Sequence, residues 1–181
     1  MGRTRMAAAF GVRAMAAFVF VLAVAAPVRA QRSMDEYEVK AAFLYNFVKF
    51  VQWPPSEQRS GAVRIGVLGR VPRLTGALQT MARGRTGNGR LIVVKEIRPS
   101  DDPREFHIVF IADSETVHAA PLLERAQGAA VLTVGESADF LRQGGIARFF
   151  VESNRVRFQI DPAGAQQEGL KVSSQLLSLA K

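Results

Sequence analysis

Residues able to carry out acid–base, nucleophilic or metal chemistry are few in this chain. The sequence contains two histidines, His107 and His118, and no cysteine. A typical zinc site needs several Cys or His ligands, and the Gly-x-Ser-x-Gly turn of many hydrolases does not occur. The carboxylates of Asp113, Glu136 and Asp139 follow predicted strands, but no spacing pairs them. We therefore expect no catalytic residue, no metal site and no cofactor.

A glycine-flanked loop lies at a position that suggests a small ligand. Gly66 and Gly69 lie where an α/β fold places its first strand-to-helix loop, which often binds ligands. The spacing does not match Gly-x-Gly-x-x-Gly, and no phosphate-binding Gly-Lys-Ser/Thr follows. An ordinary turn is the favoured interpretation. The alternative is a small-ligand-binding protein feeding a sensor kinase or transporter, with the ligand near Gly69 and Gly135 and with Arg70 or Arg73 as a counter-charge.

Residues 1–30 have the composition of a cleavable export signal. Three arginines precede the uncharged apolar run 14–26, and Val28-Arg29-Ala30 offers a small-residue cleavage site. The run is shorter than the roughly 20 residues that span a bilayer comfortably. We expect a signal peptide at 1–30, a periplasmic protein, and one domain at 31–181. An uncleaved N-terminal anchor is the alternative.

Removing the leader lowers the net charge. The whole chain has 24 basic and 16 acidic residues, net +8, and residues 1–30 contain four arginines and no acid. The remaining 20 basic and 16 acidic residues give +4. This modest charge does not indicate a nucleic-acid partner. About 150 residues are enough to build a core without disulfides.

Residues 35–55 are predicted to form one long helix. Ser33 and Glu36 match a capping box, and two prolines end the segment. At about 100° per residue, its apolar side chains cover an arc of roughly 200°, interrupted by Lys40. One core face needs only about half that width. The favoured interpretation is packing on two sides by the same domain, and the alternative is that part of the aromatic face binds a partner.

The rest of the chain alternates strands and helices. Strands are predicted at 63–68, 91–97, 107–112 and 130–134, and helices at 72–82, 115–127 and 137–143, with Pro121 marking a break or a late start. Two strands at 146–152 and 155–160, joined by Ser153-Asn154, predict a hairpin. A helix from Asp161-Pro162 to Gly169, a short strand at 170–172 and a helix at 174–179 follow. The pattern predicts an α/β fold, a single-domain three-layer sandwich whose mostly parallel sheet has a C-terminal antiparallel hairpin and flanking helices.

Several short blocks of sequence follow one another along the chain after the leader. They are YEVKAAFLYNF at 37–47 with KF at 49–50 and WP at 53–54, RIGVLG at 64–69, NGR at 88–90, VLTV at 131–134, GG at 144–145, NRVRF at 154–158 and GLKVSSQLL at 169–177. In order and spacing these blocks resemble the YfiR family of small periplasmic proteins.

The resemblance implies an exported regulator without enzymatic activity. The best-known member of that family binds the periplasmic sensing domain of an inner-membrane diguanylate cyclase and represses it, which controls cyclic di-GMP, biofilm formation and motility. An outer-membrane lipoprotein can sequester it. For this chain the expected partner is the periplasmic domain of an inner-membrane diguanylate cyclase or sensor kinase, with an outer-membrane lipoprotein or a second copy in a homodimer as further partners. The disulfides of that member do not transfer, because this chain has no cysteine.

Partner-binding residues are predicted from expected exposure, not from the family. Aromatic and arginine side chains are the usual anchors of interfaces. The predicted contacts lie on the long helix and on the hairpin: Tyr45, Asn46, Lys49, Trp53, Phe149, Glu152, Arg155 and Arg157.

Overall fold

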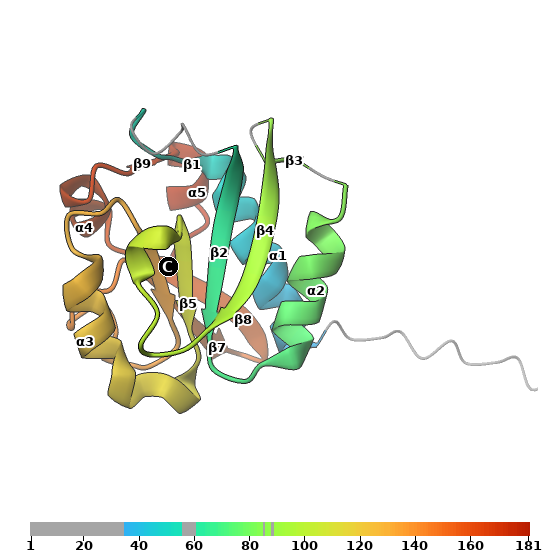
Figure 1. The fold of residues 1–181 in the computed structure, drawn as a ribbon. Coiled ribbons are helices and arrows are strands. Elements are labelled where there is room, and N and C mark those ends of the chain that lie inside the picture. Colours follow the sequence, from blue (N-terminus) through green and yellow to red (C-terminus); the bar gives the residue numbers. More distant parts are fainter. Residues whose placement is uncertain (1–34, 56–60, 85, 88) are drawn as a thin grey trace, which may run out of the picture. The chain divides into compact units, whose positions relative to one another are not determined.

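The computed structural model describes residues 35–55, 61–84, 86–87 and 89–181 (Figure 1). The predicted signal peptide and Ser33 lie outside the described residues. Within the described part, no helix has both the length and the apolar character needed to cross a bilayer.

A seven-stranded sheet forms the middle layer of the fold, in the order β3-β4-β2-β5-β6-β7-β8. The strands β4, β2, β5, β6 and β7 are parallel, whereas β3 and β8 are antiparallel to their neighbours at the two margins. The bounds are β2 Ala62–Leu68, β3 Thr86–Gly87, β4 Arg90–Ile97, β5 Ile108–Ile111, β6 Leu132–Gly135, β7 Ala147–Glu152 and β8 Arg155–Ile160. The predicted fold class is confirmed, including the C-terminal hairpin.

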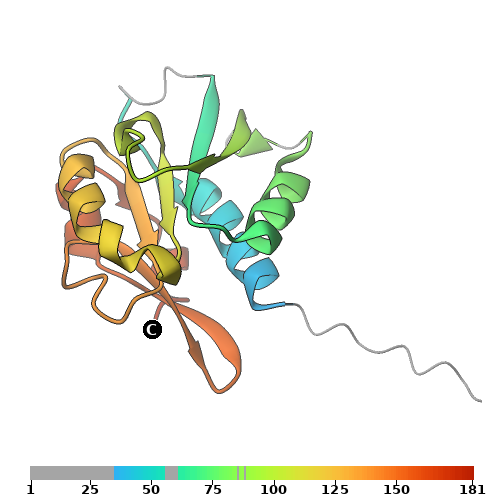
Figure 2. The same cartoon turned by 60° about the horizontal axis from the view of Figure 1, so that its bottom comes forward.

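Helices cover both faces of this sheet (Figure 2). The helices α1 (Glu36–Phe50) and α2 (Pro72–Ala82) pack on one face, and α3 (Thr116–Ala126) packs on the other. Two 3-10 turns, η2 (Pro103–Glu105) and η3 (Asp113–Glu115), follow β4 and β5. The chain continues after β8 with α4 (Pro162–Gln167), β9 (Lys171–Val172) and α5 (Ser174–Leu177).

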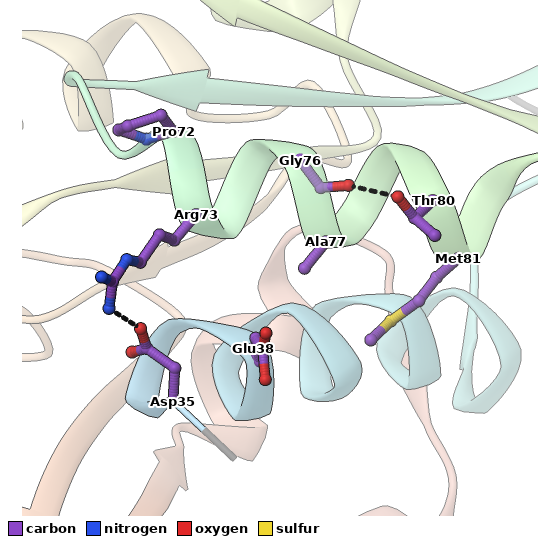
Figure 3. A pocket seen from close by; sticks show the side chains of 8 residues that line it. All are labelled: Asp35, Glu38, Pro72, Arg73, Gly76, Ala77, Thr80 and Met81. Atoms are coloured by element: carbon purple, nitrogen blue, oxygen red, sulfur yellow. Dashed lines mark hydrogen bonds and ion pairs between the residues drawn. The ribbon is translucent and has the colours of Figure 1, made fainter. Parts of the chain in front are cut away.

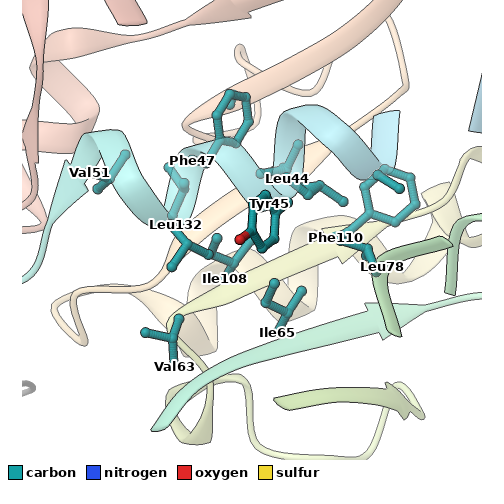
Figure 4. Close-up of a cluster of buried hydrophobic side chains, with 14 of the residues drawn as sticks. Leu44, Tyr45, Phe47, Val51, Val63, Ile65, Leu78, Ile108, Phe110 and Leu132 are labelled. Atoms are coloured by element: carbon teal, nitrogen blue, oxygen red, sulfur yellow. The ribbon is translucent and has the colours of Figure 1, made fainter. Parts of the chain in front are cut away.

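The larger core lies between α1 and the sheet. Leu44 and Phe47 of α1 belong to this core together with Ile65 of β2 and Ile108 of β5, and all four side chains are fully buried (Figure 4). The ring of Phe47 also stacks on Phe149 of β7 at a centroid distance of 5.9 Å. Because α1 contacts the sheet, α2 and the hairpin, its wide apolar arc packs against its own domain on more than one side, which is the favoured interpretation from the sequence.

A second core lies beneath α3. It joins Val109 and Ile111 of β5 to Leu122 and Leu123 of α3. In β5, residues 108 and 110 belong to the first core and residues 109 and 111 to the second. Burial on both faces explains the continuous apolar sequence of this strand.

The long helix differs from its prediction at both ends. Its N-cap is Asp35, whose side chain accepts a hydrogen bond from the backbone N–H of Tyr37 at 3.1 Å. Glu36 accepts a hydrogen bond from Lys40, and the capping box predicted with Ser33 involves a residue outside the described ones. The helix ends at Phe50, because Val51–Gln52 form a strand, β1, that pairs antiparallel with β9. Local sequence could not reveal this partner far along the chain.

Two further predictions are wrong. Residues 137–143 form successive turns, not a helix, and the ring of Phe140 from this segment packs against Gly135 and Gly145. Pro121 lies inside α3 without breaking it. The carbonyl that would lose its helical bond belongs to Val117, which is 80% exposed, so water can replace the missing donor.

Candidate partner-binding surface

The β7–β8 hairpin projects away from the helices (Figure 2). Its two-residue turn consists of Ser153 and Asn154, with φ of 49° and 60°. Two successive left-handed residues form the turn type that matches the twist of a β-ribbon, and Asn tolerates that conformation well. Residues on one side of the ribbon, Phe149 and Phe158, enter the core. The core therefore holds the base of the hairpin while the tip reaches solvent.

The tip of the hairpin combines an apolar side chain with both signs of charge. Val151 is 51% exposed, and Glu152 and Arg155, which face each other across the ribbon, are exposed. The guanidinium Nε of Arg157 lies 4.0 Å from Oε2 of Glu152. An exposed apolar side chain beside arginines is a composition that favours protein contacts.

A groove of about 450 Å³ separates the hairpin from the start of α1. The acidic first turn of α1 lines one side, and the outer half of the hairpin lines the other. The lining residues are Asp35, Glu36, Val39, Val151, Asn154, Arg155 and Val156.

A second groove, of about 640 Å³, runs between α1 and α2 (Figure 3). Asp35 and Arg73 form an ion pair across its end, and Thr80 donates a hydrogen bond to the carbonyl of Gly76 at 2.8 Å. The Tyr37 N–H first, and Arg73 second, hold the pKa of the Asp35 carboxyl below its usual value. The first turn of α1 is thus open to solvent on two sides.

A buried ion pair fixes the first turn of α1 to the sheet. Lys40, only 4% exposed, donates hydrogen bonds to Glu36 of its own helix and to Glu136 after β6. The second oxygen of Glu136 accepts the N–H of Asp113 at 2.8 Å. Burial lowers the pKa of Lys40, but the bonds to Glu136 and Glu36 outweigh it, and the net shift is upward. Burial, and then the charge of Glu136, raises the pKa of Tyr37, whose ring centroid lies 4.8 Å from the Lys40 ammonium.

Three of the predicted contact residues are buried, so the exposure expected for them is wrong. Tyr45 is 7% exposed, Trp53 is 5% exposed and Phe149 is 1% exposed. The indole N–H of Trp53 donates to the carbonyl of His107 at 3.2 Å. Tyr45 is buried because α2 packs beside α1 and covers a side of the helix that one core face would leave open.

The other five predicted residues divide into two groups. Glu152 and Arg155 are exposed and Arg157 is half-buried, and the structure brings these three together on the hairpin. Asn46 is half-buried and Lys49 is exposed on the C-terminal half of α1, and neither lines the groove beside the hairpin. Partner binding by all five stays a prediction.

Sequence reasoning missed the part that the start of α1 contributes to this surface. Val39 and Asp35 line the groove, and Val151 is an exposed apolar side chain at the tip. One signal was available, because Lys40 interrupts an apolar arc and so implied a buried partner for its charge.

The glycines of the small-ligand alternative are covered by the protein's own side chains. A Cβ at Gly69 would lie 2.8 Å from that of Ala112, and one at Gly135 would lie 2.3 Å from the ring of Phe140. Beyond β6 there is instead a hollow of about 320 Å³, lined by Glu36, Tyr37, Lys40, Asp113, Glu136, Ser137, Ala138, Phe149, Phe150 and Val151. Within the described ranges, no cluster of three or more His, Cys, Asp or Glu side chains is arranged to hold a metal ion.

Comparison with known proteins supports the fold and the family. A conserved domain protein from Vibrio cholerae O1 biovar El Tor is 13% identical, with a TM-score of 0.52, over 80% of this chain and 59% of that chain. The ABC domain of Streptococcus pneumonia, solved in complex with L-Trp, is 10% identical, with a TM-score of 0.52, over 77% of this chain and 59% of that chain. This chain thus spans about three fifths of either protein, and the likeness concerns the fold alone. No curated protein matches this chain. Residues 37–181 match the YfiR/HmsC-like family, and the chain belongs to that family.

Proposed function

We propose that this protein is an exported, non-enzymatic regulator that binds the periplasmic sensing domain of an inner-membrane signalling protein and represses it. Membership of the YfiR/HmsC-like family supports a periplasmic regulatory role in general, in a family that is regulatory rather than catalytic. The finer parts of the proposal are a diguanylate cyclase as the first partner to test, and an effect on cyclic di-GMP and biofilm formation.

The observation that carries the proposal is the hairpin beside the first turn of α1. Val151, Glu152 and Arg155 are exposed at a tip whose base is anchored in the aromatic core. The neighbouring groove adds an acidic wall, so a partner side chain could enter between opposite charges. Rigid elements that present an apolar residue inside a polar rim bind with little loss of conformational entropy.

Repression follows from unequal affinity for two states of the partner. A regulator that binds the inactive conformation more tightly shifts the population toward that conformation. Each 1.4 kcal/mol of preference changes the ratio about tenfold. The ion pair of Lys40 with Glu136 supports this role, because it keeps the first turn of α1 in place.

A calorimetric titration tests the proposal. The protein is exported from an expression host, purified from the periplasm and titrated with the periplasmic domain of a membrane cyclase or kinase encoded beside it. We expect the double variant Glu152→Ala/Arg155→Ala to weaken binding at least tenfold. The variant Arg104→Ala, which alters another exposed arginine, should not change it.

The same titration decides between the two groups of predicted contacts. Asn46→Ala/Lys49→Ala examines the C-terminal half of α1, and Arg157→Ala examines the face of the hairpin. If every one of these variants binds like the parent protein, the surface is wrong. If no neighbouring membrane sensor binds the parent protein, the proposed function is wrong.

The small-ligand alternative has one observation in its favour, the hollow beyond β6. A thermal-shift screen with periplasmic metabolites separates it from partner binding, because a ligand that binds only the folded protein raises the melting temperature.

A further inference from the structure

The β4 strand leaves most of its outer edge unpaired. Only Arg90 and Leu91 pair with β3, and among the described residues no strand pairs with that edge from residue 92 to residue 97. Figure 1 shows β4 beside β2 at this margin of the sheet. In such a strand, backbone N–H and C=O groups at alternate positions face outward and can bind a further strand.

Exposed apolar side chains accompany this edge. Leu91 is 58% exposed and Val93 is 47% exposed, and both lie on the face of the sheet that carries α3. That helix packs over β5 and leaves this part of β4 uncovered. On the opposite face, Ile92 and Val94 pack toward α2.

The edge lacks most of the features that keep natural edge strands from pairing. Its unpaired part, residues 92–97, contains no proline, and the charges there, Lys95 and Glu96, lie near the carboxyl end. A groove of about 410 Å³ adjoins it, between the end of α2 and the strand. The groove gives room for side chains of an added strand, and its lining residues are Gln79, Ala82, Arg83, Gly84, Leu91, Ile92, Val93 and Val94.

The charges around the edge are mainly basic. Arg64 is exposed and pairs in register with Val93, so it lies beside the apolar pair. Arg83 lines the groove, and Lys95 is exposed further along the strand. Glu96 is the one carboxylate on β4. A segment with acidic side chains complements this surface, and a basic one does not.

We propose that β4 accepts an extended segment of a partner protein as an added strand, one whose apolar side chains alternate with acidic ones. Backbone bonds along residues 92–97 supply the pairing, and Leu91 and Val93 supply the apolar contact on one face. Arg83, at the end of α2 on the other face, where the alternate side chains of the added strand lie, selects the charge. A membrane surface fits less well, because lipids do not pair the row of backbone groups. The edge lies at the opposite margin of the sheet from β8, so the inference is independent of the hairpin and its proposed partner.

The probe is a blocked eight-residue peptide of alternating valine and aspartate, added to the ¹⁵N-labelled protein. We expect amide shifts concentrated in residues 92–97. A peptide with lysine in place of aspartate should bind at least tenfold more weakly. Val93→Glu should weaken binding of the acidic peptide at least tenfold, and Leu91→Glu should act in the same direction. Val117→Glu is the matched control, since it alters an exposed valine on α3 and should leave binding unchanged.

Several results would overturn the inference. One is the absence of shifts in residues 92–97 at millimolar peptide, and another is equal binding of the acidic and basic peptides. Sedimentation with phosphatidylglycerol vesicles that Val93→Glu abolishes, without peptide binding, would assign the edge to a membrane. A dimer that Val93→Glu converts to a monomer would assign it to a second copy. Circular dichroism verifies that each variant folds, and Glu152→Ala/Arg155→Ala should bind the peptide like the parent protein.

Discussion

Replacing Lys40 with methionine tests whether the buried ion pair holds α1 on the sheet. The lysine is 4% exposed and its partner Glu136 has a side chain that is 8% exposed, whereas the other partner, Glu36, has a side chain that is 46% exposed. The variant Lys40→Met keeps most of the side-chain volume and removes the charge together with the hydrogen bonds that the ammonium donates. The carboxylate of Glu136 is then left in the interior without its counter-ion.

The magnitude follows from that uncompensated charge. Removing one partner of a buried ion pair costs about 3–5 kcal/mol. Glu136 still accepts the N–H of Asp113, so we expect the lower end, about 3 kcal/mol. The pair of Lys40 with the half-exposed Glu36 should contribute under about 1 kcal/mol to stability, and the variant Glu36→Gln measures this contribution. The double variant Lys40→Met/Glu136→Gln removes both charges and keeps an acceptor for Asp113, so it should recover at least half of the loss.

Urea unfolding at pH 7 is the assay. With a slope of roughly 2 kcal/mol per molar urea, a loss of about 3 kcal/mol lowers the midpoint by about 1.5 M. The raised pKa of Lys40 means that its contribution is complete at pH 7 and disappears only as the pH rises above about 10. If Lys40→Met costs no more than Glu36→Gln, the lysine is not locked in the interior and the reasoning fails.

Three further perturbations have expected outcomes. Gly135→Ala places a Cβ 2.3 Å from the ring of Phe140 and should lower the free energy of unfolding, measured with urea, by about 1–3 kcal/mol. Gly76→Ala, on a helix with open space around this position, should raise it by about 0.5–1 kcal/mol. Equal effects of the two variants would contradict the packing of Phe140 on Gly135. Phe149→Ala should lower stability by about 3–5 kcal/mol, because this ring is fully buried, and a melting temperature near that of the parent would show that the side chain is exposed after all. Because the pKa of Asp35 is lowered in the folded protein, its carboxylate stabilises the fold above about pH 4. This stabilisation is lost as the pH falls through the pKa of Asp35 in the folded protein. The difference in urea midpoint between the parent and Asp35→Asn should therefore be larger at pH 5 than at pH 2.5. An equal difference in urea midpoint at pH 5 and pH 2.5 would show that the Asp35 carboxylate does not stabilise the fold.

Strongly patterned segments were predictable from the sequence. The parallel strands appear as apolar runs because both of their faces are buried, and the two left-handed residues Ser153 and Asn154 mark the hairpin turn. Proline after an N-cap aspartate located α4. In each case the deciding forces lie within a few residues of the signal.

The misplaced residues depend on contacts far along the chain. Trp53 and Tyr45 looked exposed on a helical projection, but that projection contains neither His107 nor α2, which bury them. β1 was read as the last turn of a helix because its partner β9 is more than a hundred residues away. The hairpin part of the candidate surface was predicted from the sequence. The contribution of the first turn of α1 was not, because it depends on how the helix and the hairpin, which are distant in sequence, lie beside the same groove.

The pairing of β1 with β9 joins the beginning of the domain to its end. Val51 opposes Val172, and the N–H of Ser173 donates to the carbonyl of Phe50, so the first helix of the domain is completed by residues near its far end. Contacts of such long sequence separation form late, because the loop that joins them must close first. A chain emerging from a ribosome or a translocation channel therefore cannot finish this domain until its last strand is free. Until then the backbone groups of Val51 and Gln52 lack the strand with which they pair in the folded domain.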